Sequence, residues 1–220
     1  MAEKKLEGAG LRGQVAGKTS LSTVGKAGKG LTYRGYEIEV LAEKAFFEEV
    51  AYMLLYGNLP NEEQYSSYTN KLKKLRALPN ELKEVLENIP ASAHPMDVMR
   101  TGCSMLGNLE PEGDFKNQNS SADRILASLA SIIVYWYKFS HEGKKVSLET
   151  DYETIGGHFL SLLTDKGPSE DDIRCLDTSL ILYAEHGFNA STFTARTCAS
   201  TLSDIHSCIT GAIGTLRGPL

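Results

Sequence analysis

The clearest combination of chemically useful residues lies within residues 183–196, where the letters EHGFNAST occur. This pattern predicts a helix that ends at Gly187 in a left-handed C-cap, followed by a new helix that Asn189 or Ser191 caps. His186 would then lie at a helix C-terminus, where the dipole favours the protonated imidazole. The first N–H groups of the new helix would favour an anion. The segment therefore predicts a site for a carboxylate ligand, with His186 as a binding residue.

The residues alone also allow a purely structural role for His186, because histidines are common at helix ends. The sequence has four other histidines. His94 precedes a proline and can help to start a helix, and His141 is expected at the surface. His158 is expected to be a partly buried structural residue, and His206 lies among polar neighbours. No H-x-x-x-H pair occurs, so a helical metal site is not predicted and no metal ligand is assigned.

The four cysteines, Cys103, Cys175, Cys198 and Cys208, form no C-x-x-C pair and have no histidine at zinc spacing. They are expected to be buried thiols in a reducing cytoplasm, where disulfides are rare. Cys198 and Cys208 fall in predicted helices, in which cysteine packs as a small hydrophobic residue. Neither a disulfide nor a metal centre is expected.

Most of the elements that would position the site are predicted to be helices. Only the glycine-rich residues 8–36 favour β-structure, with strands at 22–24 and 31–33 joined by a loop at 25–30. Beyond them, apolar residues recur at helical spacing. Helices are expected over residues 41–56, 61–76, 79–90, 95–106, around 125–136 as far as Gly143, 151–163 and 169–187.

Local signals indicate where several of these helices begin and which faces they bury. Asn61 and Ser169 each precede, by three residues, a glutamine or aspartate that completes a capping box. Residues 108–121 are typical of a surface loop. The basic run within 71–76 is expected to be a solvated face. The last helix is expected to bury Ile173, Leu176, Leu180 and Tyr183.

Composition places the chain among ordinary globular proteins. Its 220 residues are 41% hydrophobic and 23% charged, and the formal net charge is -5. Basic and acidic residues are mixed, which argues against a nucleic-acid partner. No apolar run approaches the roughly 20 residues of a membrane span, and residues 1–10 lack the apolar core of a signal peptide. We therefore expect a mostly α-helical protein that acts on a small molecule or binds another protein.

Four motifs, in collinear order, resemble the citrate synthases. They are residues 33–38 (YRGYEI), 94–101 (HPMDVMRT), 185–196 (EHGFNASTFTAR) and 211–220 (GAIGTLRGPL). The similarity runs from about residue 21 to the last residue. Residues 22–26 (STVGK), Trp136 between two tyrosines, and residues 156–160 (GGHFL) are more similar to the bacterial 2-methylcitrate synthases than to ordinary citrate synthases.

The resemblance implies a condensation of oxaloacetate with an acyl-CoA, with propionyl-CoA favoured, to give 2-methylcitrate and free CoA. His186 stands at the position of the family histidine that binds oxaloacetate, and Asn189 would hold the turn around it. The thioester is a substrate, so no cofactor is implied. The family also implies a cytoplasmic homodimer. Residues 1–40 would form an N-terminal arm with a β-hairpin, and residues 41–220 the first part of a large multi-helical domain.

The sequence departs from the family pattern at its end. In the family, the catalytic histidine directly follows a G-P-x sequence, and this sequence ends at GPL. The resemblance therefore places the catalytic acid–base residues, the small domain and the C-terminal helices beyond residue 220. No catalytic residue is expected within the chain, and the 220 residues alone are expected to be inactive. Alternatives are a citrate synthase that uses acetyl-CoA, a truncated non-catalytic paralogue that acts as a subunit-interaction module, and an unrelated helical protein.

Overall fold

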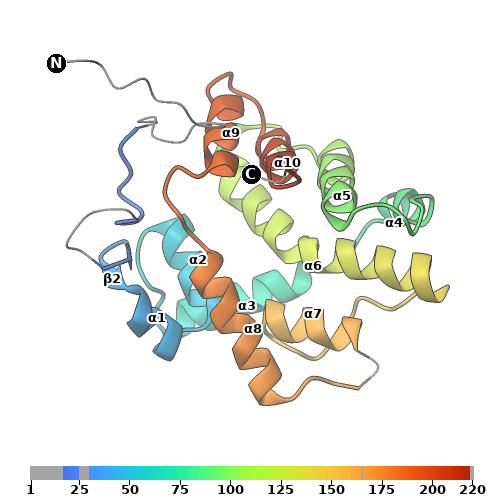
Figure 1. Cartoon of the computed structure of the whole chain (residues 1–220), viewed down its shortest axis with the longest axis horizontal. Helices are drawn as coiled ribbons and strands as arrows, with labels where there is room; N and C mark the ends of the chain where they lie inside the picture. Colours follow the sequence, from blue (N-terminus) through green and yellow to red (C-terminus); the bar gives the residue numbers. More distant parts are fainter. Residues whose placement is uncertain (1–16, 25–29, 165, 219–220) are drawn as a thin grey trace.

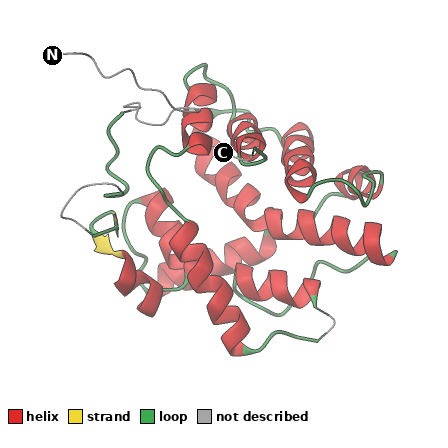
Figure 2. Ribbon diagram, in the orientation of Figure 1, coloured by secondary structure: helices red, strands yellow, loops and turns green. Residues whose placement is uncertain are grey.

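The computed structural model describes residues 17–24, 30–164 and 166–218. Within these ranges the chain forms ten α-helices, one short 3₁₀-helix and two short strands. Figures 1 and 2 show how the helices are arranged. The prediction of a mostly helical chain with a small N-terminal β-hairpin is confirmed. Most of the predicted arm, the hairpin loop at 25–29 and the last two residues of the GPL motif lie outside the described residues.

The N-terminal β-structure combines a tight hairpin with the predicted strand pair. Strand β1 (Thr32–Tyr33) pairs antiparallel with β2 (Tyr36–Glu37), which is not among the predicted strands. The predicted pairing of 22–24 with 31–33 is also present. Ser22 forms a bridge with Tyr33, and the Thr23 N–H donates to the Thr32 carbonyl oxygen at 3.2 Å. β1 therefore lies between β2 on one side and residues 22–23 on the other.

The helix predicted over 41–56 is two helices, α1 (Ile38–Lys44) and α2 (Phe47–Tyr56). The break lies at Ala45, which has an extended ψ of 161°. Side-chain acceptors satisfy the N–H groups that the break exposes, because Glu49 accepts from Phe46 at 2.8 Å and Asp177 accepts from Phe47 at 2.9 Å. The prediction of one continuous helix is therefore wrong. Local sequence could not reveal the break, because Asp177, which accepts from the Phe47 N–H, lies 130 residues away in sequence.

Three helices lie close to their predicted positions: α3 (Glu62–Lys74), α4 (Asn80–Glu87) and α5 (Pro95–Leu109). The capping box of α3 is present, with Asn61 accepting from the Gln64 N–H at 2.8 Å and Gln64 accepting from the Asn61 N–H at 2.9 Å. His94 caps α5, and its Nδ1 accepts from the Met96 N–H at 3.2 Å. The expected role of His94 at a helix start is confirmed.

The basic run within 71–76, which spans the last turn of α3 and the residues just after it, is not wholly solvated. Arg76 is buried and donates to the carbonyl oxygens of Tyr152 and Glu153. Lys71 donates to the buried carboxylate of Asp123 at 2.5 Å. The expected solvated face is therefore wrong for Arg76, because a guanidinium with carbonyl partners can be buried.

The central helix, α6 (Gln118–Glu142), begins earlier than predicted. It follows the 3₁₀-helix η1 (Phe115–Asn117), so the loop predicted over 108–121 is shorter than expected. The polar first turn of α6 is exposed to solvent and needs no apolar partner, so polarity alone does not mark a loop. Gly143 ends α6 with a left-handed φ of 66°, as predicted.

The last pair of helices before the site are α7 (Ile155–Leu163) and α8 (Glu170–Tyr183). Thr154 caps α7, which therefore begins after the predicted start at 151. Ser169 caps α8 as predicted and accepts from the Asp172 N–H at 3.1 Å. The buried face of α8 differs from the prediction, because Tyr183 is 88% exposed.

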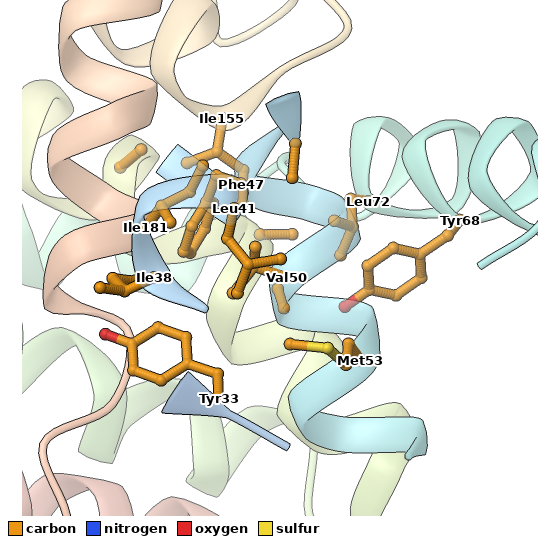
Figure 3. Close-up of a cluster of buried hydrophobic side chains, with 14 residues drawn as sticks. Tyr33, Ile38, Leu41, Phe47, Val50, Met53, Tyr68, Leu72, Ile155 and Ile181 are labelled. Atoms are coloured by element: carbon orange, nitrogen blue, oxygen red, sulfur yellow. The ribbon is translucent and has the colours of Figure 1, made fainter. Parts of the chain in front are cut away.

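Three clusters of buried apolar side chains form the core, and α6 contributes to all of them. The first joins β1 to α1, α2, α3, α6, α7 and α8, and Figure 3 shows its side chains. The second surrounds Trp136. The third is Cys103, Ile125 and Ile213, which connects α5 and α6 with α10 (Ile205–Thr215). The expected central position of α6 is confirmed.

The cysteines differ from one another in exposure. Cys103 and Cys208 are buried, Cys198 is partly buried, and Cys175 is exposed on α8. The prediction of four buried thiols is therefore wrong for Cys175. Cys198 lies on α9 (Ala190–Ala199) and Cys208 on α10, which confirms their predicted helical positions.

Candidate functional site

His186 lies in the connection between α8 and α9, residues 184–189, which we call the His186 turn (Figure 1). α8 ends at Tyr183 rather than at Gly187. Gly187 does have the predicted left-handed conformation, with a φ of 65°, but it lies within the turn and does not cap the helix. His186 is therefore separated from the end of α8.

The buried hydroxyl of Tyr33 explains why α8 ends early. It donates to the Leu182 carbonyl oxygen at 3.1 Å and accepts from the Glu185 N–H at 3.4 Å. These two backbone groups are thus partnered outside the helix ladder. Figure 3 shows the Tyr33 hydroxyl at the edge of the first core cluster, beside the chain that leaves α8. Burial, the largest influence, raises the pKa of Tyr33, so this hydroxyl keeps its proton at neutral pH.

The His186 side chain is exposed to solvent. Among the residues that the structure describes, none forms a hydrogen bond or an ion pair with its imidazole. The predicted position of His186 at a helix C-terminus is wrong, because α8 ends at Tyr183 and His186 lies beyond the last helical turn, to which the dipole effect is confined. His186 is therefore an exposed residue in the turn between two helices.

Asn189 begins the helix that follows. Its side-chain oxygen accepts from the Thr192 N–H at 2.9 Å and from the Ser191 hydroxyl at 2.7 Å. The predicted cap of α9 is confirmed for Asn189, and Ser191 supports it. The first turn of α9 therefore starts directly after the His186 turn, and the positive end of its dipole lies next to that turn.

Glu185 is a member of the turn that sequence reasoning did not single out. Its Oε1 accepts from the Gly187 N–H at 2.5 Å and from the Ser22 hydroxyl at 3.2 Å. Ser22 lies 163 residues before Glu185, so no local pattern could reveal the pair. The only local sign of a role for Glu185 was the sequence EHG, which places a carboxylate acceptor two residues before the N–H of Gly187.

Aromatic packing fixes the second half of the turn. The Arg196 guanidinium lies over the Phe188 ring, 4.9 Å from its centre. Gly17 lies on the same ring, since a Cβ atom there would be 3.2 Å from Phe188. Phe188 thus contacts both the N-terminal segment and α9.

The remaining histidines have structural surroundings or lie apart from this turn. His141 is exposed, as expected. His158 is more deeply buried than expected and contacts the hydroxyls of Ser131 and Thr150, each at 3.0 Å. Burial, followed by the charge of Arg76, lowers the pKa of His158 to about 4. His206 is buried beside Asp204, and burial lowers its pKa.

The described residues contain no group of three or more histidine, cysteine, aspartate or glutamate side chains that could hold a metal ion. Across residues 17–24, 30–164 and 166–218, no helix is both long and apolar enough to span a membrane.

The chain matches the family described as "Citrate synthase, C-terminal domain" over residues 10–220, and it belongs to that family. The 2-methylcitrate synthase of Shewanella oneidensis is 67% identical over 217 residues, which are 99% of this chain and 58% of that enzyme. 2-Methylcitrate synthase 1 of Corynebacterium glutamicum is 41% identical over 96% of this chain and 57% of its own length.

Solved structures agree with this assignment. The crystal structure of citrate synthase from Thermotoga maritima superposes with a TM-score of 0.82 at 33% identity, over 96% of this chain and 56% of that chain. The structure of citrate synthase from Thermoplasma acidophilum, in a ternary complex with carboxymethyl coenzyme A and oxaloacetate, superposes with a TM-score of 0.84 at 25% identity. This match covers 95% of this chain and 55% of that chain. The chain thus spans between half and two thirds of the length of these relatives.

Proposed function

We propose that this chain forms the oxaloacetate-binding part of an acyltransferase that condenses oxaloacetate with an acyl-CoA. The observation that carries the proposal is the exposed His186, held in a fixed turn directly before the N-terminus of α9. An imidazole can donate a hydrogen bond to a ketone or carboxylate oxygen, and the first N–H groups of a helix attract anions. Oxaloacetate offers both kinds of acceptor. Asn189 supports the site by starting α9 at this point.

We propose propionyl-CoA as the favoured acyl donor and 2-methylcitrate and CoA as the products. The 67% identity to an enzyme named 2-methylcitrate synthase supports this choice. Acetyl-CoA is the alternative donor. We further propose a cytoplasmic homodimer without a cofactor, which sedimentation velocity would test. Residues 41–220 would form the first part of its large helical domain, and the catalytic acid–base residues would come from outside the chain.

A fusion protein tests the activity directly. Residues 1–220 replace the matching part of the Shewanella oneidensis enzyme, and thiol release is followed with oxaloacetate and either propionyl-CoA or acetyl-CoA. We expect a higher kcat/KM with propionyl-CoA and no turnover by the 220 residues alone. His186→Ala should raise the KM for oxaloacetate by roughly tenfold to a hundredfold, because a hydrogen bond to a charged ligand contributes about 1.5–3 kcal/mol.

His141→Ala is the matched control, because His141 is also exposed but lies at the far end of α6. Its KM for oxaloacetate should stay unchanged. A preference for acetyl-CoA would contradict the 2-methylcitrate assignment, and turnover by the 220 residues alone would contradict the proposed division of the site. An unchanged KM in His186→Ala would remove His186 from the binding site.

One observation favours the alternative of a subunit-interaction module. A cavity of about 410 Å³ opens between α2, α5, α6, α7 and α8. Its lining is almost wholly apolar and includes Met99, Leu129, Ile133, Phe159, Leu176 and Leu180. An inactive fusion with an intact fold would favour this alternative over the acyltransferase.

A further inference from the structure

We propose that Glu185 is a positioning residue for His186, and that Ser22 in the N-terminal segment holds Glu185 in place. This inference rests on the proposed function of His186 as an oxaloacetate ligand. Neither Glu185 nor Ser22 needs to touch the substrate. Their role is to fix the backbone from which the imidazole projects.

The geometry places one carboxylate oxygen at the centre of the turn. Glu185 Oε1 accepts from the Gly187 N–H at 2.5 Å, which closes the backbone around His186. The same oxygen accepts from the Ser22 hydroxyl at 3.2 Å. Residues on both sides of His186 are therefore held through one acceptor, while His186 itself is left without a partner among the described residues.

The anchor for this acceptor is a buried residue that pairs with β1. Ser22 is only 4% exposed and bridges to Tyr33, which is fully buried. The Arg34 N–H donates to the Leu21 carbonyl oxygen at 2.7 Å and extends the same pairing. Tyr33 in turn contacts the backbone on both sides of Ala184. The turn thus rests on the core through two independent side chains, Ser22 and Tyr33.

A competing role for Glu185 would be to act through its charge on the imidazole. The structure gives no ion pair between Glu185 and His186 within the described residues. Glutamine in place of Glu185 distinguishes the two roles, because it keeps the acceptor oxygen and removes the charge. A neutral glutamine still offers a carbonyl oxygen to the Gly187 N–H, whereas alanine offers none. Rescue by glutamine therefore identifies positioning.

The test uses Glu185→Ala and Glu185→Gln, with Glu81→Ala on the exposed face of α4 as the control. Hydrogen exchange at the Gly187 amide is measured in the 220-residue chain, and kcat and KM for oxaloacetate in the fusion. We expect Glu185→Ala to speed Gly187 exchange and to raise KM, each about tenfold, as for the loss of one hydrogen bond. The change in kcat should be smaller. Glu185→Gln should restore both values, and Ser22→Ala should give a smaller effect of the same kind.

The outcomes separate this inference from the proposed function. Unchanged Gly187 exchange in Glu185→Ala overturns the positioning role, whatever happens to KM. Failure of Glu185→Gln to restore KM also overturns it, because the charge would then be the active feature. An unchanged KM in His186→Ala removes the proposed function instead, while the Gly187 exchange still reports whether Glu185 holds the turn.

Discussion

Glu48 illustrates, at the scale of the residue, how burial controls a side chain. It is 0% exposed in α2, and its Oε1 accepts from the Ile155 N–H at 2.6 Å. Its Oε2 has no hydrogen-bond partner among the described protein atoms. Burial, as the largest influence, raises the pKa of Glu48 from 4.5 to about 7. The folded chain therefore favours the protonated carboxyl, which α2 presents to the start of α7.

This pKa predicts a specific pH dependence for Glu48→Gln. Protonation of Glu48 stabilises the fold fully below pH 4.5, its ordinary pKa, and this contribution is lost as the pH rises to about 7. Glutamine is neutral throughout and can still accept from the Ile155 N–H. The free energy of unfolding of Glu48→Gln should therefore rise relative to the native chain across this range, by up to about 3 kcal/mol.

Urea unfolding at several pH values measures this difference, and Glu81→Gln on the exposed face of α4 is the control. Parallel pH profiles for Glu48→Gln and the native chain would show that Glu48 has an ordinary pKa in the fold.

Residue-scale features were predictable from the sequence where their partners are local. Asn61, His94, Ser169 and Asn189 all cap the expected helices, because each accepts from an N–H two or three residues ahead. The partners of Arg76 and the Ser22 hydroxyl that donates to Glu185 are far away in sequence and were not predictable. His186 was identified by type and motif, but its exposure could not be derived from either.

Helix packing, at the scale of the element, depends on two glycines with opposite surroundings. Gly102 lies in α5 where it crosses α6, and a Cβ atom there would be 2.5 Å from the Cγ2 atom of Ile132. Gly156 lies in α7, where the nearest atoms to a Cβ would be in Leu176 at 3.7 Å. A methyl group at position 102 would therefore clash with Ile132, whereas one at position 156 would make ordinary contact with Leu176.

We expect Gly102→Ala to lower the free energy of unfolding by about 1–3 kcal/mol, because the added methyl group overpacks the contact between α5 and α6. Gly156→Ala should raise it by up to about 1 kcal/mol, because alanine favours the helix more than glycine. Urea unfolding followed by circular dichroism measures both. Equal effects of the two substitutions would contradict the packing described between α5 and α6.

Element positions were largely predictable, and their ends were not. Periodicity located the helices, but α1 and α2 are separate because Asp177 and Glu49 accept the N–H groups at the break. α8 ends early because Tyr33 partners its last backbone groups. In both cases a distant side chain competes with the helix ladder, and hydrophobic periodicity carries no information about it.

The whole molecule has an apolar cavity of about 410 Å³ that remains open in the described structure. Family membership was predictable from four short motifs, but this cavity was not, because it requires the relative placement of five helices. Its lining residues, such as Leu129 and Leu180, are only partly buried. Exposed apolar surface of this kind binds apolar molecules.

We expect the fluorescent dye ANS to bind the native 220-residue chain at this cavity, and to bind the fusion with the Shewanella enzyme more weakly if the added segment covers it. Leu129→Lys with Leu180→Lys should reduce the fluorescence of the 220-residue chain. Fluorescence titration provides the measurement, with circular dichroism to check the fold of each variant. Equal dye binding by the native chain and the double variant would place the dye elsewhere.

The hydrogen bonds from Tyr33 and Ser22 to the His186 turn also bear on the order of folding. They join residues that are 149 to 163 positions apart, so they close long loops of the chain. Contacts of such long range form only after the intervening chain has lost most of its entropy. We therefore expect the His186 turn to acquire its final shape late in folding, when residues 22–33 reach the end of α8.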